Sequence, residues 1–568
     1  MLEFKKEINL DNEIAKLKKI TNIISLLSVI LVVNIIVWAI CIFTLNYQIQ
    51  YIIIFSISLV IYLFYLFFTY RYYAKLNHKN NLKKVYFNHK LRRNNEYNKF
   101  FDTGLDLIDK DDYKESDLDL FGKNSLFQYL SICKTKYGRL KLKESLTTIK
   151  EEDNKYTDAI NVLANDENTL DIEASLLEFN NEAKTLDYDI MYQIFENKIK
   201  FKLIFLLPII SFISMIIYLI LIFTLSLNPY YLFIFAFTNI FFAKISLKND
   251  VFDIDSAKYY SLIDNYYNLS LILNNLKYEN EYLNEIVDES KNSISDIKNL
   301  KSLLNMLSTR RNLIFNVISN SLFIFDLFAI LIFNIKSKSI INLKKYFELI
   351  GGLECMISLA NIGIDNEVYA IPESGNLKGL DMYHPLIKDC VPNSFELNGG
   401  VILTGSNMSG KTTFMRTLGI CQTLYNAKGL IPAKSFKSEN INIYTSLRAN
   451  DMLAEGISTF YAEILRMKKI NQAIKNEKAL ILIDEIFKGT NAKDRIEASL
   501  KVIDKLNNYN ALFIITTHDF ELCEANNIIN YHFNEEYNDD KISFDYKIKE
   551  GKCQTKNAIY LLKMADII

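Results

Sequence analysis

Between positions 405 and 412 the chain reads Gly-Ser-Asn-Met-Ser-Gly-Lys-Thr, the GxxxxGK(S/T) pattern of a phosphate-binding loop. An apolar stretch at 401–403 precedes the loop, and a helical stretch begins at Thr413. In this context successive backbone N–H groups can point into one concavity and bind phosphate oxygens. Lys411 then offers a positive charge to the phosphates, and the Thr412 hydroxyl can bind Mg²⁺. The pattern predicts a site for a nucleoside triphosphate. The residues expected to bind it are Gly405, Ser406, Asn407, Met408, Ser409, Gly410, Lys411, Thr412 and Thr413.

A second apolar stretch, at 479–483, ends in two acidic residues. Its uninterrupted apolar character is typical of a strand buried on both faces of a parallel sheet. An acid at the end of such a strand can hold Mg²⁺, and the next carboxylate can orient or deprotonate the attacking water. A strand that simply meets solvent at two acids is the alternative interpretation. Because a phosphate loop is present, we favour a catalytic role for these acids. Thr412 and Asp484 are then the metal ligands, and Glu485 is the general base.

A third apolar stretch, at 511–515, is followed by Thr516, Thr517, His518 and Asp519. A single histidine is more often a structural or a surface residue. Open α/β sheets, however, bind their ligands at the carboxyl ends of neighbouring strands, which is where this histidine would lie. We therefore predict that His518 is a second catalytic residue, in contact with the γ-phosphate.

Together with shorter segments around them, these elements resemble one family, the MutS mismatch-repair ATPases, a branch of the ABC-type P-loop ATPases. An upstream segment with Asp119-Leu120-Phe121 and Thr135-Lys136-Tyr137-Gly138-Arg139 also resembles the start of that family's helical core domain. The segments that carry the resemblance in the C-terminal part are, in chain order, His384-Pro385-Leu386, Val391-Pro392-Asn393, Thr404–Arg416, Ile431-Pro432-Ala433, Asp451, Gly456–Phe460, Ile483-Asp484-Glu485, Gly489-Thr490-Asn491, Asp494 and Thr516–Leu522.

The resemblance implies ATP and Mg²⁺ as cofactors, and a homodimer with shared sites as the active unit. In this family a Ser-Thr-Phe segment of one subunit caps the nucleotide of the other, which assigns Ser458 and Thr459 to nucleotide binding. Hydroxyl side chains at a helix start suit phosphate, although they can equally cap their own helix. One residue departs from the family pattern. Asn426 stands where glutamine is frequent, so we assign no Mg²⁺ or water contact to it.

Three stretches, 23–46, 51–70 and 203–243, contain no charged residue. About 20 apolar residues cross the hydrocarbon layer of a membrane as a helix. The third stretch is broken at Asn228-Pro229 and is long enough for two spans, so we predict four transmembrane helices in two hairpins. Buried helices of a large soluble domain are the alternative, but globular helices rarely lack a charged face over such lengths.

Basic residues flank the outer ends of both predicted hairpins, whereas the linkers near Tyr47 and Asn228 carry none. Positive charge is retained on the cytoplasmic side of a membrane. We therefore expect a multi-pass protein of the cell membrane whose core and ATPase domains face the cytoplasm. The flanking basic residues are Lys16, Lys18, Lys19, Arg71, Lys75, Lys79, Lys83, Lys84, Lys198, Lys200, Lys202, Lys244 and Lys248.

A further apolar segment, 313–335, is interrupted by Asn316, Asn320 and Asp326. An acid inside a lipid-facing helix is costly, so we predict a buried core helix here rather than another span. Before this segment, apolar residues recur at spacings of four and three, which is typical of a helical packing seam. The residues of this seam are Leu262, Tyr266, Leu269, Leu273 and Leu276.

The predicted fold class is α+α/β: a helical core with two transmembrane helical hairpins, followed by a C-terminal ABC-type P-loop α/β ATPase domain. The resemblance begins near residue 96, so we expect no counterpart of the family's mismatch-recognition domain. The predicted divisions are 1–95 (first hairpin with basic flanks), 96–200 (first part of the core), 201–248 (second hairpin), 249–366 (second part of the core) and 367–568 (ATPase domain).

These observations support two functions: a membrane-anchored ATPase dimer that holds DNA, and a membrane-remodelling or signalling ATPase that does not bind DNA. The chain has 65 Lys+Arg against 66 Asp+Glu, a balance that gives no overall attraction to nucleic acid. The basic run Lys79–Arg93 follows a predicted span, where anionic lipid explains it better. An ABC transporter fits less well, because Ser-Thr-Phe replaces the LSGGQ signature of transporters. The seven cysteines lack CxxC spacing and indicate neither a zinc site nor a disulfide framework.

Overall fold

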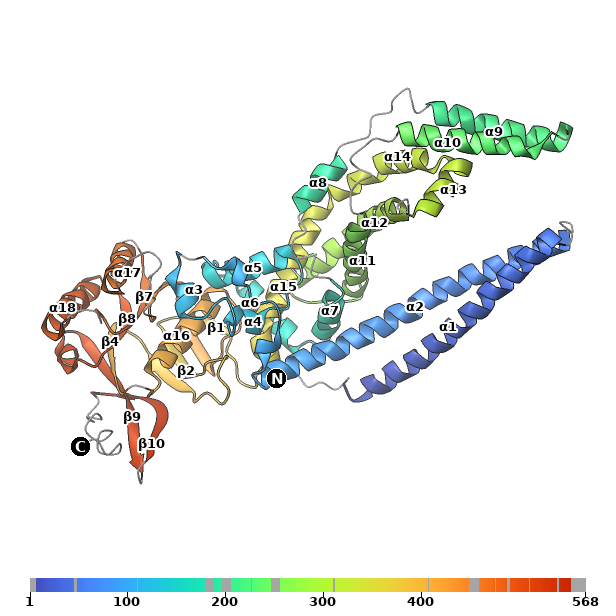
Figure 1. Cartoon of the computed structure of the whole chain (residues 1–568). Helices are drawn as coiled ribbons and strands as arrows, with labels where there is room; N and C mark the ends of the chain where they lie inside the picture. Colours follow the sequence, from blue (N-terminus) through green and yellow to red (C-terminus); the bar gives the residue numbers. More distant parts are fainter. Residues whose placement is uncertain are drawn as a thin grey trace.

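The computed structural model describes residues 7–44, 49–109, 111–179, 188–196, 206–225, 227–246, 256–309, 312–406, 408–448, 459–475, 477–487, 491–509, 511–538 and 541–552. Within these residues helices and strands are mixed, and the strands all lie in the C-terminal part of the chain. Figure 1 shows an elongated molecule with the sheets at one end and long helices extending toward the other.

The C-terminal part contains the sheet that the three apolar stretches predict. Its six strands have the order β10-β9-β4-β8-β7-β6, and all neighbours are parallel except β9 and β10. The three predicted strands are confirmed as β4, β7 and β8, which lie side by side in the middle of the sheet. The bounds are β4 (Gly400–Thr404), β6 (Asn442–Ser446), β7 (Ala479–Asp484), β8 (Leu512–Thr516), β9 (Ile528–Asn538) and β10 (Lys541–Glu550).

Two helical layers cover this sheet because successive side chains of a strand point to opposite faces. Leu480 and Leu482 of β7 pack in the core that contains α16 (Lys411–Asn426) and the helices of the N-terminal part. Ile481 and Ile483 pack on the other face, against α17 (Thr459–Ala473) and α18 (Ala492–Asn508). A second sheet, in the order β1-β5-β2-β3, also contacts α16. Its strands are β1 (Pro372–Ser374), β2 (Lys378–Met382), β3 (Asn393–Glu396) and β5 (Ser435–Ser438).

The helical core is built around α15 (Leu343–Asp365), whose second half is buried almost completely. This helix packs against α5 (Lys136–Thr147), α6 (Asn154–Asn165) and α12 (Glu281–Thr309) and leads directly into the sheets. Four of the five predicted seam residues, Leu262, Tyr266, Leu269 and Leu273, lie on α11 (Ser256–Leu273) and are buried, which confirms a packing face there. Leu276 follows the end of the helix and is partly buried. The other helices of the core are η1 (Tyr97–Lys99), η2 (Leu105–Leu107), α3 (Tyr113–Asp117), α4 (Leu126–Leu130), α5 (Lys136–Thr147), α6 (Asn154–Asn165), α7 (Asn168–Leu176), α8 (Tyr188–Glu196), α12 (Glu281–Thr309) and η7 (Ser337–Ile340).

The upstream segment around Thr135 marks a close crossing of α5 and α15. The Thr135 hydroxyl caps α5 by accepting from the Gly138 N–H at 3.1 Å. The carboxylate of Glu354 on α15 accepts from the Lys134 N–H at 2.9 Å and from the Thr135 N–H and hydroxyl. Burial raises the pKa of Glu354 to about 7, against the opposing effect of these donors. The two helices approach so closely because Gly138 and Gly351 lie at the contact.

A second crossing fixes the end of the long helix α2 (Ile49–Arg93) against the core. His89 is fully buried, and its ring nitrogens contact Asp365 at 2.9 Å and Glu173 at 3.2 Å. Burial alone would lower the pKa of His89, but the two carboxylates outweigh it and raise the pKa to about 9. Arg93 also pairs with Asp365, the last residue of α15. This part of α2 lies outside the predicted span at 51–70 and belongs to the core.

Four apolar helices correspond to the predicted hairpins: α1 (Glu7–Thr44) pairs with α2, and α9 (Leu206–Leu225) pairs with α10 (Leu232–Ser246). Among the described residues, α1, α2 and α15 are long and apolar enough to cross a membrane, whereas the apolar stretches at α9 and α10 are shorter. The apolar windows of α1 and α2 are unburied, but α15 lies in the core. At the predicted break of the second hairpin, Asn228 caps a short turn, η5 (Pro229–Tyr231). Spanning of a membrane stays a prediction.

The prediction of one buried core helix at 313–335 is wrong. The segment forms two helices, α13 (Leu313–Phe323) and α14 (Phe325–Lys336), which meet at an angle of 95°. Ile324 at the break has a φ of 42°, and the Asn320 side chain accepts from the Asp326 N–H at 2.9 Å. Asn320 and Asp326 are buried at this bend, and their hydrogen bond joins the end of one helix to the start of the next. Part of the apolar surface of both helices is exposed.

The α5–α15 crossing can be tested with two neighbouring glycines. A Cβ atom at Gly351 would lie 2.5 Å from the Tyr137 Cβ and 2.8 Å from its backbone carbon, whereas a Cβ at Gly352 meets no atom within 4 Å. We expect Gly351→Ala to lose about 1–3 kcal/mol through overpacking. Gly352→Ala should gain up to about 1 kcal/mol from helix propensity. Thermal unfolding midpoints of the purified proteins measure both changes, and equal midpoints would contradict this account of the crossing.

Candidate active site

The phosphate-binding loop connects β4 to α16, as the sequence predicts. Gly405 has a φ of 145° and Gly410 a φ of 105°, angles that side-chain-bearing residues rarely adopt. A Cβ at Gly405 would also lie 3.0 Å from the Phe533 carbonyl oxygen and the Ser409 hydroxyl. Glycine is therefore required at both turns of the loop. Asn407 lies outside the described residues.

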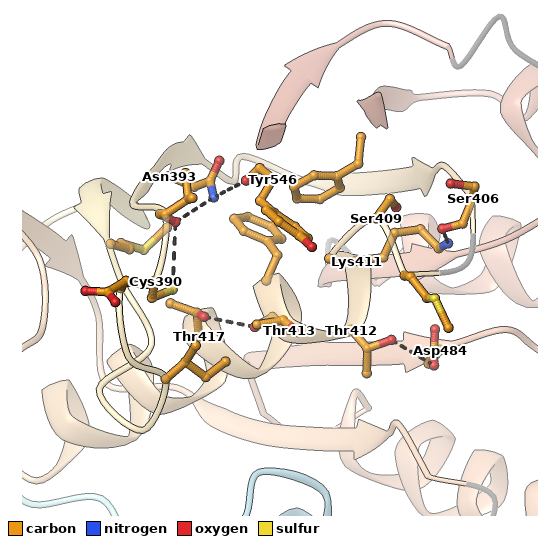
Figure 2. Close-up of a pocket in the computed structure, with 18 of the residues that line it drawn as sticks. Cys390, Asn393, Ser406, Ser409, Lys411, Thr412, Thr413, Thr417, Asp484 and Tyr546 are labelled. Atoms are coloured by element: carbon orange, nitrogen blue, oxygen red, sulfur yellow. Dashed lines mark hydrogen bonds between the residues drawn. The ribbon is translucent and has the colours of Figure 1, made fainter. Parts of the chain in front are cut away.

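Lys411 is buried at the start of α16. Its ammonium group donates to the carbonyl oxygens of Gly405 and Ser406, each at 2.7 Å, so the loop holds the charge above its own concavity (Figure 2). Both acceptors are neutral. A phosphate oxygen that enters the concavity would offer the ammonium a charged and therefore stronger acceptor.

The two predicted metal ligands come from different elements and meet at the end of the sheet. The Thr412 hydroxyl donates to Asp484 Oδ2 at 3.2 Å, as Figure 2 shows. The other oxygen of Asp484 accepts from the hydroxyl of Thr516, which is its partner in the register of β7 and β8. Hydroxyl and carboxylate oxygens are the ligands that Mg²⁺ prefers, and Mg²⁺ usually completes its shell with water and phosphate. The residues present fit this ion.

The two predicted catalytic residues also lie together. Glu485 has a φ of 60°, and its backbone N–H donates to the Thr516 carbonyl at 3.2 Å, which turns the chain sharply after β7. His518 Nε2 lies 3.2 Å from Glu485 Oε1. The side chain of His518 is 45% exposed and that of Glu485 is 32% exposed. The pair therefore faces outward, and a histidine in this position can hold the carboxylate toward a water molecule.

The loop that carries His518 is anchored on both sides. The Thr517 N–H donates to the Leu403 carbonyl of β4 at 3.2 Å, and the Thr517 hydroxyl accepts from the Asp519 N–H at 2.9 Å. Arg495 on α18 forms two hydrogen bonds of 2.7 Å to the Asp519 carboxylate. This paired contact resists displacement of the loop. The position of His518 is thus set by the sheet on one side and by α18 on the other.

These residues border a cavity of about 720 Å³. Of the predicted nucleotide-binding residues that the structure describes with their side chains, all but Gly405 line this cavity, and Asp484 and Glu485 line it as well. His518 does not line it but contacts it through Glu485. Sequence reasoning missed part of the lining, namely Met382, Ile387, Lys388, Asp389, Cys390, Val391, Asn393, Phe414, Thr417, Phe533 and Tyr546.

Among the missed residues, Tyr546 has the most evident chemistry. It lies on β10 with a φ of 52°, and a Cβ at Gly410 would lie 3.3 Å from its ring. Asn393 holds this strand by donating to the Tyr546 carbonyl at 2.9 Å and accepting from the Ile548 N–H at 2.8 Å (Figure 2). An aromatic ring beside the phosphate loop can stack on a nucleobase. No motif around Tyr546 signals this, because β10 follows the loop by more than a hundred residues.

The segment that begins at His384 shapes another wall of the cavity. His384 is buried, and its ring Nδ1 accepts from the Leu386 N–H at 3.3 Å, while the backbone N–H of His384 donates to Cys390 Sγ. Burial, together with the nearby Arg416, lowers the pKa of His384 to about 4. The imidazole is therefore neutral at physiological pH. Its contacts fold the loop that brings Cys390 to the cavity.

Asn426 lies at the far end of α16, away from the cavity. Its side chain accepts from Gln422 at 2.9 Å and donates to the Ile441 carbonyl at 2.8 Å. It therefore joins the end of α16 to the residue that precedes β6. Ser458 lies outside the described residues, as does the side chain of Thr459 at the start of α17. Their assignment stays a prediction.

Comparison with known proteins agrees with the motifs. Residues 401–567 match the family model described as MutS domain V. The chain is 30% identical over 239 residues to the DNA mismatch repair protein MutS of Persephonella marina, covering 39% of this chain and 27% of the relative. It is 31% identical over 247 residues to MutS protein homolog 4 of Mus musculus, which covers 39% of this chain and 25% of the relative. It is 32% identical over 198 residues to the DNA mismatch repair protein MutS of Aquifex pyrophilus, which covers 32% of this chain and 23% of the relative. The chain thus spans about a quarter of the length of the curated relatives it matches. Its C-terminal part is similar to MutS domain V.

The site makes a direct prediction for two variants. Lys411→Ala should abolish ATP binding, since it removes the charge that faces the phosphates. Glu485→Gln should keep ATP binding but slow hydrolysis by about 10²-fold or more, because only the proton acceptor is lost. Nucleotide binding and phosphate release measure the two effects. Glu497→Gln, an exposed carboxylate on α18 that pairs with Lys501, is the matched control and should behave as the unmodified protein. Hydrolysis by Glu485→Gln at the unmodified rate would refute the assignment of the base.

Proposed function

We propose that this chain is a membrane-anchored ATPase that hydrolyses Mg-ATP in a dimer and couples hydrolysis to DNA binding near the membrane. The observation that carries the proposal is the convergence of Lys411, the Thr412–Asp484 pair and the Glu485–His518 pair at one edge of the sheet. Each pair joins a charged group to a partner from another strand or loop. Such preorganised groups are what phosphoryl transfer requires.

The chemistry follows from these positions. Thr412 and Asp484 would hold Mg²⁺, which would neutralise the negative charge that develops on the phosphates. Glu485, held by His518, would accept a proton from a water molecule whose oxygen attacks the γ-phosphorus. The bond between that phosphorus and the β–γ bridging oxygen breaks, and ADP leaves with the bond's electron pair. Lys411 would stay with the phosphates throughout and balance their charge.

The exposed side of the catalytic pair supports a dimer. His518 and Glu485 face outward, so one flank of the γ-phosphate would be open in a single chain. In the proposed dimer, Ser458 and Thr459 of the partner subunit close this flank. Closure would exclude water and strengthen each electrostatic contact at the phosphates. It would also tie ATP binding to the approach of two chains.

The apolar helices support the membrane anchor. The apolar windows of α1 and α2 are unburied, and α9 and α10 expose large apolar side chains along their length. All four helices project away from the sheets (Figure 1). Because exposed apolar surface of this extent is costly in water, lipid is the medium that suits it. Basic residues at the outer ends of both hairpins favour a cell-membrane location with the ATPase in the cytoplasm.

The DNA part of the proposal depends on the similarity to mismatch-repair relatives, which covers the ATPase part of the chain. The near-neutral charge balance gives no independent support. The alternative, a membrane-remodelling or signalling ATPase without DNA, uses the same site and the same anchor. The two differ only in whether the helices outside the ATPase part bind DNA.

The membrane anchor predicts a labelling pattern in intact cells. In a cysteine-free background, a membrane-impermeant maleimide should label Tyr230→Cys, at the exposed turn between α9 and α10. Lys123→Cys, on the exposed surface of the core, should stay unlabelled until the cells are permeabilised. Labelling of Lys123→Cys in intact cells would overturn the two-hairpin arrangement.

The function itself predicts ATP-dependent dimerisation and DNA retention. Glu485→Gln should be dimeric by light scattering with ATP. It should bind duplex DNA with an affinity that falls at least about tenfold between 50 and 200 mM salt, since phosphate contacts release counterions. Lys411→Ala, which cannot respond to ATP, should show neither change. A dimer without DNA binding would favour the alternative function, and a monomer with ATP would refute the shared site.

A further inference from the structure

A second cavity, of about 530 Å³, lies in the helical core between α5, α6, α12 and α15. It shares no lining residue with the nucleotide cavity. Polar and apolar groups both line it, among them Lys150, Tyr156, Tyr282, Leu349, Cys355 and Met356. Neither the motifs nor the similarity to MutS domain V assigns this place a role.

Three lysines line the cavity, and they differ in how their charge is balanced. Lys141 pairs with Glu144 at 3.0 Å, and Lys345 pairs with Glu285 at 2.8 Å. Lys150 is half-buried, and its ammonium lies over the ring of Tyr156. Among the described residues Lys150 forms no ion pair, although the charges of Asp153 and Glu144 act on it. Removal from water lowers the pKa of Lys150 to about 8, so at neutral pH the group is still mainly charged. A partly desolvated cation of this kind favours an anion beside it.

The side chains that line the cavity limit which kinds of anion it can bind. Tyr156 and Tyr282 form an edge-to-face pair with ring centroids 5.7 Å apart, and aliphatic side chains continue this apolar surface. Burial raises the pKa of the Cys355 thiol, so it contributes no negative charge. Glu144 and Glu348 at the border disfavour a polyanion such as a nucleoside triphosphate. The lining suits one negative charge on an aromatic or apolar body.

Lys150 also contacts the ATPase domain through its backbone. Its N–H donates to the Asn426 carbonyl at 3.0 Å, and its carbonyl accepts from the Asn440 side chain at 3.2 Å. Asn426 is the last residue of α16, and Lys411 is the first. A ligand that draws the Lys150 side chain into the cavity therefore acts on a segment joined to the helix of the phosphate loop.

We propose that this cavity is a regulatory site that binds a small aromatic or apolar monoanion at Lys150, and that its occupation changes the rate of ATP hydrolysis. Binding of the anion is argued from the cavity alone, whereas regulation depends on the proposed ATPase function. The two claims can therefore be refuted separately.

The test uses the purified full chain, with 2-naphthoate as the anionic probe and 2-naphthamide as its neutral counterpart. Calorimetric titration should give binding of 2-naphthoate at least about tenfold tighter than of 2-naphthamide, the difference expected for a charge-assisted contact. Lys150→Met, which keeps the length of the side chain and removes its charge, should abolish this preference. Lys277→Met, at an exposed lysine elsewhere in the core, is the matched control and should retain it.

A second variant blocks the cavity without touching the charge. A Cβ at Gly352 meets no atom within 4 Å, and Gly352 lines the cavity, so Gly352→Trp should fill the space and prevent binding. Gly352→Ala serves as its folding control. Equal binding of both probes, or unchanged binding to Lys150→Met and Gly352→Trp, would overturn the site.

ATP turnover then tests the regulatory half. At saturating 2-naphthoate the hydrolysis rate should change at least twofold in the unmodified protein and stay constant in Lys150→Met. Binding without any change in rate would overturn regulation while the site stands. Lys411→Ala should still bind 2-naphthoate, so failure of the ATPase assignment cannot imitate failure of the site.

Discussion

The register of three parallel strands is the constraint on which the site depends. β4, β8 and β7 end at the same edge of the sheet, with Asp484 opposite Thr516 and Leu403 opposite Thr516 on the other side. Only this alignment lets Thr412, at the start of α16, reach Asp484 across the edge. It also lets the Glu485 N–H bond the Thr516 carbonyl. Because side chains alternate along a strand, a slip by one residue would turn Asp484 to the opposite face and separate the pair.

The sheet is connected to the rest of the chain through α15, whose contacts are unusually close and polar. Gly138 and Gly351 bring two helix backbones together, and Glu354 holds the loop before α5 through three donors. Buried charges rarely add stability compared with apolar groups of the same shape, but losing one partner is costly. These groups therefore set the geometry of the crossing more than its strength. A helix placed this accurately can carry a change in the C-terminal domain into the helical core.

The sequence predicted those parts of the site whose residues lie close together in the chain. The phosphate loop, the three strands and the α11 seam are each encoded within one short segment of the sequence. Prediction failed at 313–335, because the composition of an apolar run does not show where the run bends. The structure bends at Ile324, with Asn320 and Asp326 buried beside the bend. Tyr546 and the Lys150 cavity were also missed, since both depend on contacts between segments distant in sequence. The spanning of a membrane and the roles of Ser458 and Thr459 remain predictions.

The helix α2 joins the two ends of the molecule. Its 45 residues form one helix, about 68 Å long at about 1.5 Å per residue. Its last turns are held by His89, which lies between Asp365 and Glu173 with no exposed surface. Asp365 is the final residue of α15, directly before the sheets. A rotation of the ATPase domain about this point must either carry α2 with it or separate buried charged groups, which costs about 3–5 kcal/mol. Movement of α2 with the domain is the less costly course, so under the proposed function a nucleotide-driven motion would reach the α1–α2 hairpin through α2.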